Sequence, residues 1–256
     1  MNLLKEVLCA LLVAALAGCL LLRPAERKLI FFPTHHEPSR SALAAGLTRW
    51  SIDGEYTGYA RLIDEPRRVW LFLHGNGGQA ADRDYALHCF HPRDSVYILE
   101  YPGYGARPGS PSMAAFNRAA AVAYEWLVRK YGTDRLLVLG ESLGSGPACY
   151  LATVPTPPSH IVLVVPFDVL ADVAREKFSH VPVGVLLVDN WNNIEALREF
   201  RGQVDVYGAT RDNVIPVAHA RNLARRHPGA IYHEFEGDHG WATGNAVDLS
   251  EIGSKR

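Results

Sequence analysis

The stretch Gly140-Glu141-Ser142-Leu143-Gly144 places a serine between two glycines, each two positions away from it. It follows an apolar run over 136–139, which is typical of a buried strand, and it precedes 145–152, which predicts a tightly packed helix. A Cβ at either glycine would clash with the neighbouring strand and helix of so sharp a turn, and the serine hydroxyl is presented where the strand ends. The sequence therefore predicts Ser142 as a nucleophile. A serine that only caps a helix is the alternative.

A serine hydroxyl needs a base to take its proton and an acid to orient that base. In this kind of strand–turn–helix arrangement the chain order is serine, acid, histidine. Asp212 lies in a loop over 210–216 that follows an alternating strand, and His239 lies in a turn over 236–241 that follows another strand. Open α/β sheets place ligands at the carboxyl ends of their strands, so we expect Asp212 and His239 to meet Ser142 there.

Other histidines and aspartates could compete for these two roles. The competing histidines fall inside expected helices or strands: His219, His227 and His233. His239 is the one in a turn after a strand, bracketed by Gly237 and Gly240, so we expect it to be the base. Asp168, which follows an apolar strand over 161–165, is the alternative to Asp212 as the acid.

A glycine-rich loop is expected to supply hydrogen-bond donors for a developing oxyanion. The apolar run 69–73 predicts a central strand, and it leads directly into His74-Gly75-Asn76-Gly77-Gly78. Glycines allow a backbone to approach a ligand closely. We expect one donor to be the N–H of Leu143 and the other to be the N–H of Asn76, with Gly77 as second choice. His74 is expected to hydrogen-bond the loop backbone, and a plain glycine-rich turn is the alternative.

The pattern along the chain predicts an α/β fold. Strand-like runs alternate with helical stretches such as 112–131, which favours a mainly parallel sheet with helices on both faces. The segments 47–52 and 56–63 alternate and are expected to add antiparallel strands at one edge. Between Phe167 and Val204 we expect a short cap, in which the apolar run 181–187 lines an acyl pocket or belongs to the core.

Composition limits the kinds of partner. The chain has 256 residues, is 48% hydrophobic and has a net charge of −1, which fits one substantial core and gives no electrostatic argument for nucleic acid. Cys89 and Cys149 are expected to be two buried thiols rather than a disulfide. No Cys/His pattern has metal-ligand spacing, so neither a metal nor a cofactor is expected. The sequence gives no indication of the oligomeric state.

These motifs resemble those of a known family. The chain is similar to small serine hydrolases of the α/β-hydrolase superfamily, in particular to the branch that includes membrane-anchored protein depalmitoylases and uncharacterised bacterial proteins. The matching pieces, in the family's order, are 28–33, 74–78, 99–105, 140–144, 165–167, the Asp212 loop and 237–239. The resemblance implies an α/β-hydrolase fold and a Ser142–His239–Asp212 triad that cleaves acyl esters or thioesters.

The sequence departs from the family pattern at three places, which makes the substrates of relatives an unsafe guide. Glu100 stands where aspartate is more usual, Gly240 follows the histidine where asparagine is common, and Arg107-Pro108 replaces a usual serine. Two alternatives to an esterase are a serine peptidase with the same triad and a catalytically silent, membrane-anchored binding module.

The N-terminus predicts attachment to a membrane. An apolar run over 7–17 ends in Leu16-Ala17-Gly18-Cys19, which resembles a bacterial lipobox with Cys19 as the lipidated residue. Because the apolar stretch continues to Leu22, a single uncleaved anchor is the alternative, and a soluble chain is the third possibility. We therefore expect residues 1–22 to be a signal peptide or anchor and 23–256 to form one catalytic domain, in a bacterial cell-envelope lipoprotein.

Overall fold

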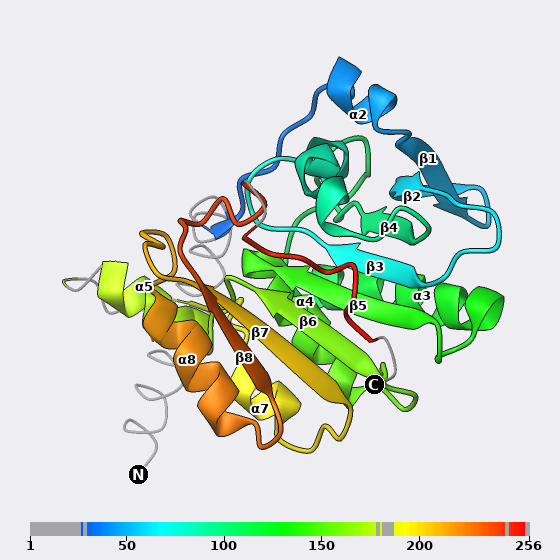
Figure 1. The fold of residues 1–256 in the computed structure, drawn as a ribbon. Helices are drawn as coiled ribbons and strands as arrows, with labels where there is room; N and C mark the ends of the chain where they lie inside the picture. Colours follow the sequence, from blue (N-terminus) through cyan, green and yellow to red (C-terminus); the bar gives the residue numbers. More distant parts are fainter. Residues whose placement is uncertain (1–26, 28–29, 178–179, 181–186, 244–245, 254–256) are drawn as a thin grey trace, which may run out of the picture.

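An eight-stranded sheet organises the chain in the computed structural model, which describes residues 27, 30–177, 180, 187–243 and 246–253 (Figure 1). Its strand order is β1-β2-β4-β3-β5-β6-β7-β8. The strands are β1 (Thr48–Ile52), β2 (Glu55–Arg61), β3 (Val69–Leu73), β4 (Ser95–Leu99), β5 (Leu136–Glu141), β6 (His160–Val164), β7 (Gln203–Ala209) and β8 (Ile231–Phe235).

Most strands of the sheet run parallel, and an antiparallel pair lies at one edge. β4, β3, β5, β6, β7 and β8 pair in parallel, with Leu71 opposite Tyr97 on one side and Val138 on the other. β3, β4 and β5 are buried along their whole length, as expected of parallel strands covered on both faces. β1 and β2 pair antiparallel at one edge, so the expected antiparallel addition is confirmed.

Helices cover one face of the sheet and a mixed layer covers the other. The α-helices are α2 (Arg40–Ala44), α3 (Met113–Tyr131), α4 (Ser145–Tyr150), α5 (Leu170–Lys177), α7 (Asn193–Leu197) and α8 (Val217–Arg226). The helices α3, α4, α7 and α8 bury Phe116, Ala148, Leu197 and Leu223 in one core. The opposite core contains side chains of α2, of the 3-10 helix η1 (Ala80–Cys89) and, near the C-terminus, of Trp241, Ala242, Val247 and Leu249.

The longest helix shows why the sequence prediction for 112–131 is confirmed. The Ser112 Oγ accepts a hydrogen bond from the Ala115 N–H at 3.1 Å, which satisfies one free donor of the first turn. Gly132 ends α3 with a φ of 80°, which glycine adopts without steric cost. The expected helix over 145–152 is shorter, because α4 ends at Tyr150 and a 3-10 turn, η3 (Leu151–Thr153), continues it.

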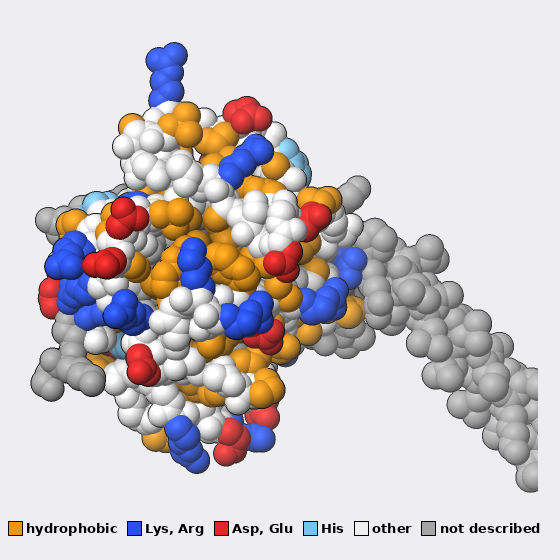
Figure 2. All heavy atoms as spheres, turned by 90° about the vertical axis from the view of Figure 1, so that its right-hand side faces the viewer, with side chains coloured by type: hydrophobic (Ala, Val, Ile, Leu, Met, Phe, Trp, Pro, Cys, Tyr) orange, Lys and Arg blue, Asp and Glu red, His pale blue; other side chains and the backbone are white. Residues whose placement is uncertain are grey.

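Apolar side chains gather in the middle of the face seen in Figure 2, the side on which β1, β2 and α3 lie in Figure 1. Where α3 meets β1 and β4, the Trp50 ring lies 5.1 Å from the Tyr97 ring and 5.8 Å from the Trp126 ring. The Lys130 ammonium lies 4.9 Å from the Trp126 ring, so a cation partly caps this aromatic cluster. The cluster fixes α3 against the antiparallel edge.

Two predictions fall partly or wholly outside the described residues. The lipobox, Cys19 and the whole segment 1–22 lie there, and so does most of the apolar run 181–187. In the part of the chain that the structure describes, no helix combines the length and apolarity needed to cross a membrane.

The turn after β5 is the tightest point of the fold. Ser142, in the 3-10 turn η2 (Ser142–Gly144), has a φ of 51°, a left-handed conformation that costs a non-glycine residue about 1–3 kcal/mol. A Cβ built on Gly140 would lie 2.7 Å from the Ala148 Cβ, and one built on Gly144 would lie 2.0 Å from the Leu73 carbonyl oxygen. Both flanking glycines are therefore required, as the sequence predicts.

The contact at Gly144 gives a stability prediction. Gly144→Ala should lower the free energy of unfolding by about 3 kcal/mol, because the new methyl group meets the backbone of β3 and not a side chain that can move aside. Gly77→Ala is the matched control, since a Cβ there meets nothing within 4 Å. Denaturant unfolding followed by circular dichroism measures both. Equal stability of the two variants would contradict the packing described for the turn.

Candidate active site

The structure brings Ser142, His239 and Asp212 into one hydrogen-bonded row. The His239 Nε2 lies 2.9 Å from the Ser142 Oγ, and the His239 Nδ1 lies 2.7 Å from the Asp212 Oδ2. The three side chains come from the turn after β5, the loop after β7 and the turn after β8, all at the carboxyl edge of the sheet, on the side where α5 lies (Figure 1). Their predicted catalytic roles stay predictions, but the spatial arrangement that those roles need is present.

The Asp212 carboxylate is fixed so that one oxygen faces the histidine. Its Oδ1 accepts the N–H groups of Val214 and Ile215, both at 2.8 Å, which leaves Oδ2 for His239. The Asp212 side chain is 1% exposed, whereas that of His239 is 24% exposed, so solvent reaches the histidine but not the carboxylate. A carboxylate only accepts, so the contact requires a proton on Nδ1 and leaves Nε2 of the neutral ring able to accept from Ser142.

Asp168, the alternative acid, is bonded elsewhere. Its Oδ1 lies 2.6 Å from the His219 Nδ1 and its Oδ2 accepts the Asn222 amide at 2.6 Å. Burial disfavours the charged form of Asp168, but the hydrogen bonds from His219 and Asn222 outweigh burial and lower its pKa. Another competing histidine, His233, lies 2.7 Å from the Asp205 carboxylate. Among the competing groups, Asp168, His219 and His233 are therefore occupied in other pairs.

The glycine-rich loop lies beside the nucleophile turn. A Cβ built on Gly75 would lie 3.4 Å from the Ser142 Cβ, so backbone and nucleophile are in close contact there. The His74 Nδ1 donates to the Gly75 carbonyl at 2.7 Å, which confirms the expected role of His74 in holding the loop. Within the described residues no acceptor is assigned to the Asn76 N–H. The role of the Asn76 and Leu143 N–H groups as oxyanion donors stays a prediction.

The Asn76 side chain has a contact that the sequence analysis did not foresee. Its Oδ1 accepts from the Phe32 N–H at 3.0 Å and from the Tyr104 hydroxyl at 2.9 Å, and its Nδ2 donates to the Ile30 carbonyl. The side chain is therefore used to join the loop to the segment 30–32, and only the backbone of Asn76 is left for a ligand. Local patterns gave no signal for this contact, because it joins positions far apart in the chain.

A buried ion pair beneath the loop was also missed. The Arg83 Nε donates to the Glu141 Oε2 at 3.0 Å, and the Tyr85 hydroxyl donates to the Oε1 at 2.6 Å. Burial disfavours ionisation of Glu141, but the Arg83 guanidinium, the Tyr85 hydroxyl and the Gly75 N–H outweigh burial and hold the pKa of the carboxyl below its ordinary value. The sequence analysis gave Glu141 no role of its own, although it lies inside the 140–144 motif.

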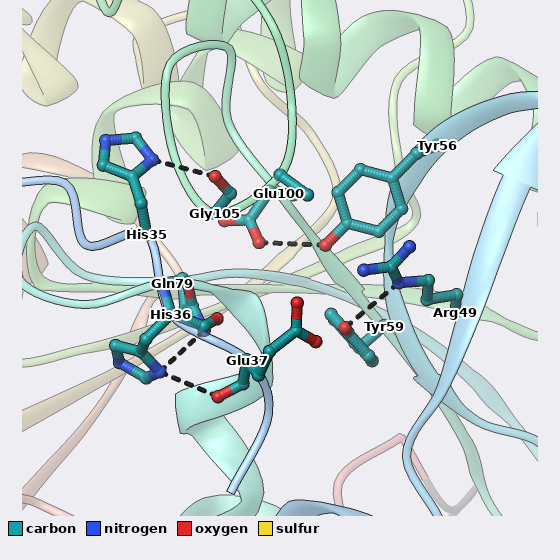
Figure 3. A pocket seen from close by; sticks show the side chains of 10 residues that line it. His35, His36, Glu37, Arg49, Tyr56, Tyr59, Gln79, Glu100 and Gly105 are labelled. Carbon is teal, nitrogen blue, oxygen red and sulfur yellow. Dashed lines mark hydrogen bonds between the residues drawn. The ribbon is translucent and has the colours of Figure 1, made fainter.

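A polar pocket of about 210 Å³ lies next to the loop, with Gln79 and Gly105 in its wall (Figure 3). Figure 3 shows Tyr56 facing Glu100, whose Oε2 accepts the Tyr56 hydroxyl at 3.1 Å. The Oε1 of Glu100 accepts the Ala80 N–H at 3.1 Å. A Cβ on Gly105 would lie 2.2 Å from the Oε2. The glutamate that departs from the family pattern thus organises the floor of this pocket and requires a glycine above it.

Metal-ligating side chains and cysteine thiols are two other candidates for chemistry at the site. Within the described ranges, no group of three or more His, Cys, Asp or Glu side chains is arranged to hold a metal ion. Cys89 and Cys149 are both buried free thiols, as expected, and burial raises the pKa of Cys89 to about 11. A thiol with that pKa is almost fully protonated at neutral pH and is a poor nucleophile.

Comparison with known proteins identifies sequence relatives of this chain. A scan against models of known protein families finds no match. The uncharacterized protein Rv2307c of Mycobacterium tuberculosis is 32% identical over 208 residues, which are 77% of this chain and 74% of that protein. The lysophosphatidylserine lipase ABHD12 of Danio rerio is 29% identical over 139 residues, which are 51% of this chain but only 36% of the lipase.

Solved structures share the fold. The Pyrococcus furiosus esterase Pf2001 superposes with a TM-score of 0.61 at 12% identity, and the match covers 82% of this chain and 90% of the esterase. At that identity the likeness establishes the architecture alone. The mostly parallel sheet and the turn at Ser142 agree with this architecture, the lipase is a hydrolase relative, and the mycobacterial protein is a relative over most of the chain. The chain therefore belongs to the α/β-hydrolase superfamily, in one family with the mycobacterial protein Rv2307c.

Proposed function

We propose that this protein is a serine hydrolase that cleaves carboxylic acyl esters, and thioesters as a second substrate class, through an acyl-enzyme. The observation that carries the proposal is the row in which the His239 Nε2 lies 2.9 Å from the Ser142 Oγ and its Nδ1 lies 2.7 Å from Asp212. These are hydrogen-bond distances of the kind that activate a serine. The similarity of the chain to a lysophosphatidylserine lipase and to an esterase supports acyl esters as the substrate class.

The proposed reaction follows from this geometry. The Ser142 Oγ attacks the acyl carbonyl while the His239 Nε2 takes the hydroxyl proton, and Asp212 stabilises the imidazolium that forms. The N–H groups of Leu143 and Asn76 bind the oxyanion of the tetrahedral intermediate. The imidazolium then protonates the leaving alcohol or thiol as the bond to it breaks. Water, deprotonated by the same histidine, attacks the acyl-enzyme and releases the acid.

The nucleophile is tested by Ser142→Ala, measured on the full chain in detergent. The variant should lose labelling by a fluorophosphonate probe and should hydrolyse p-nitrophenyl esters at least ~10³-fold more slowly, because no oxygen remains to attack the carbonyl. Ser145→Ala is the matched control, since Ser145 is fully buried and its Oγ accepts from the Asn193 amide. Turnover retained by a folded Ser142→Ala protein would show that another group carries the reaction. A wild-type protein that neither labels nor turns over would favour a binding module.

The acid is tested by a matched pair of aspartates. Asp212→Asn should lower kcat by about 10³-fold or more, because the amide favours the wrong tautomer of His239. Asp168→Asn should leave kcat within a few-fold, since Asp168 is bonded to His219 and Asn222. Steady-state kinetics on one ester series measures both. The opposite ranking of the two variants would move the acid to the loop after β6.

We also propose that Cys19 carries acyl chains that attach the catalytic domain to a cell-envelope membrane. The support is the stretch Leu16-Ala17-Gly18-Cys19 after an apolar run. Intact mass spectrometry of the native, detergent-extracted protein should give a chain that begins at Cys19, and Cys19→Ser should accumulate a heavier precursor without lipid. Cys9→Ser, in the same apolar run, should be processed normally. A mature mass that begins at Met1 or Asn2 would instead indicate an uncleaved anchor.

A further inference from the structure

We infer that Arg83 and Glu141 are positioning residues that aim the Asn76 N–H at the oxyanion and fix its distance from the nucleophile turn. The inference deepens the proposed function and rests on it. Neither residue belongs to the triad or to the pair of proposed oxyanion donors. Both side chains are almost fully enclosed, at 7% and 9% exposure, so they touch the loop and the turn and not the solvent.

The direction of the Asn76 N–H follows from the peptide unit that it shares with Gly75. The Gly75 carbonyl accepts two donors, the Arg83 Nη2 at 3.2 Å and the His74 Nδ1 at 2.7 Å. In a planar trans peptide the C=O and the N–H point in opposite directions. Two donors that hold the carbonyl toward Arg83 therefore hold the Asn76 N–H away from Arg83. The lack of any assigned acceptor for that N–H within the described residues is what a donor kept for a ligand requires.

Arg83 also fixes the next part of the loop. The same Nη2 donates to the Gly77 carbonyl at 2.5 Å, while the Nε donates to Glu141 at 3.0 Å. One planar guanidinium thus joins two loop carbonyls and one carboxylate. A lysine has a single nitrogen and lacks this rigid fork, so it cannot reproduce the same set of contacts.

Glu141 joins the loop to the nucleophile turn. Its Oε2 accepts the Gly75 N–H at 2.9 Å, and the residue directly precedes Ser142 in the chain. A Cβ built on Gly75 would lie 3.3 Å from the Glu141 Cδ, so the carboxylate packs directly against the backbone of the loop. Together with the close contact of Gly144 with β3, this carboxylate therefore fixes the separation between the Leu143 and Asn76 N–H groups. Oxyanion donors must lie about 2.7–3.1 Å from the developing charge, so a small change in that separation weakens the site.

The experiment compares Arg83→Lys with the matched control Arg61→Lys in the full chain. Arg61 is also an arginine whose guanidinium donates to backbone carbonyls, those of Leu87, His91 and Asp94, and it lies at the end of β2. We expect Arg83→Lys to lower kcat by about 10²-fold with KM changed less than about threefold, because one oxyanion donor is misdirected in the transition state alone. Arg61→Lys should leave both constants unchanged.

Two further readouts separate positioning from a general loss of structure. An alkyl boronic acid forms a tetrahedral anion on a catalytic serine, so its inhibition constant should rise by the same factor as kcat/KM falls in Arg83→Lys. The pH dependence of kcat/KM should keep its midpoint, because the His239–Asp212 pair is untouched.

Glu141→Gln, which keeps an oxygen for the Gly75 N–H, should lose less activity than Glu141→Ala.

The outcomes are distinct from those that test the triad. Full kcat in folded Arg83→Lys, or a loss that appears equally in KM, overturns the positioning role and leaves the role proposed for Ser142 unaffected. Activity that does not depend on Ser142 overturns the proposed function instead. If neither Arg83→Lys nor Glu141→Gln unfolds cooperatively, the pair serves stability and the positioning role is wrong.

Discussion

The left-handed backbone of Ser142 is the constraint on which the rest of the site depends. A φ of 51° at a non-glycine residue persists only where the surroundings over-determine it, and here β3, β5 and α4 all do so. Gly144 lies against the Leu73 carbonyl so closely that a methyl group would overlap it. The end of β3, where the glycine-rich loop begins, therefore packs directly against the turn. A movement of the loop would disturb the serine.

Buried charge is distributed along the carboxyl edge so that each carboxylate has its own donors. Glu141 is held by Arg83, Tyr85 and a backbone N–H, and Asp168 is held by His219 and Asn222. Taking a charge out of water is costly unless it is paired, so each of these groups needs its partners. Among the described residues, Asp212 is therefore the carboxylate that hydrogen-bonds His239, while the neighbouring Glu141 and Asp168 are bound to other donors.

The sequence predicted the fold and the triad, but not the contacts that surround the triad. The row of Ser142, Asp212 and His239 could be predicted because each residue follows a strand, and carboxyl ends of parallel strands meet at one edge. Arg83 and Tyr85 could not, because η1 is a 3-10 helix without the apolar period that marks an α-helix. The use of the Asn76 side chain against residues 30–32 joins positions far apart in the chain, and local patterns carry no signal for such a contact. Helices on both faces were correctly expected, whereas the part that Trp241, Ala242, Val247 and Leu249 play in covering one face had no signal in the sequence pattern.

The segment that precedes β1 connects the proposed membrane attachment to the proposed chemistry. Pro33 bridges to Gly78, the Thr34 N–H donates to the Gly78 carbonyl at 3.3 Å, and the Thr34 carbonyl accepts the Gly105 N–H at 2.9 Å. Residues 30–34 therefore lie directly on the glycine-rich loop and not on the far side of the sheet. An attachment through residues before this segment would hold the carboxyl edge, and with it Ser142, close to the anchored end. If such an attachment exists, a substrate with its acyl chain in the same bilayer would reach the serine from the membrane surface, because residues 30–34 lie against the loop beside Ser142.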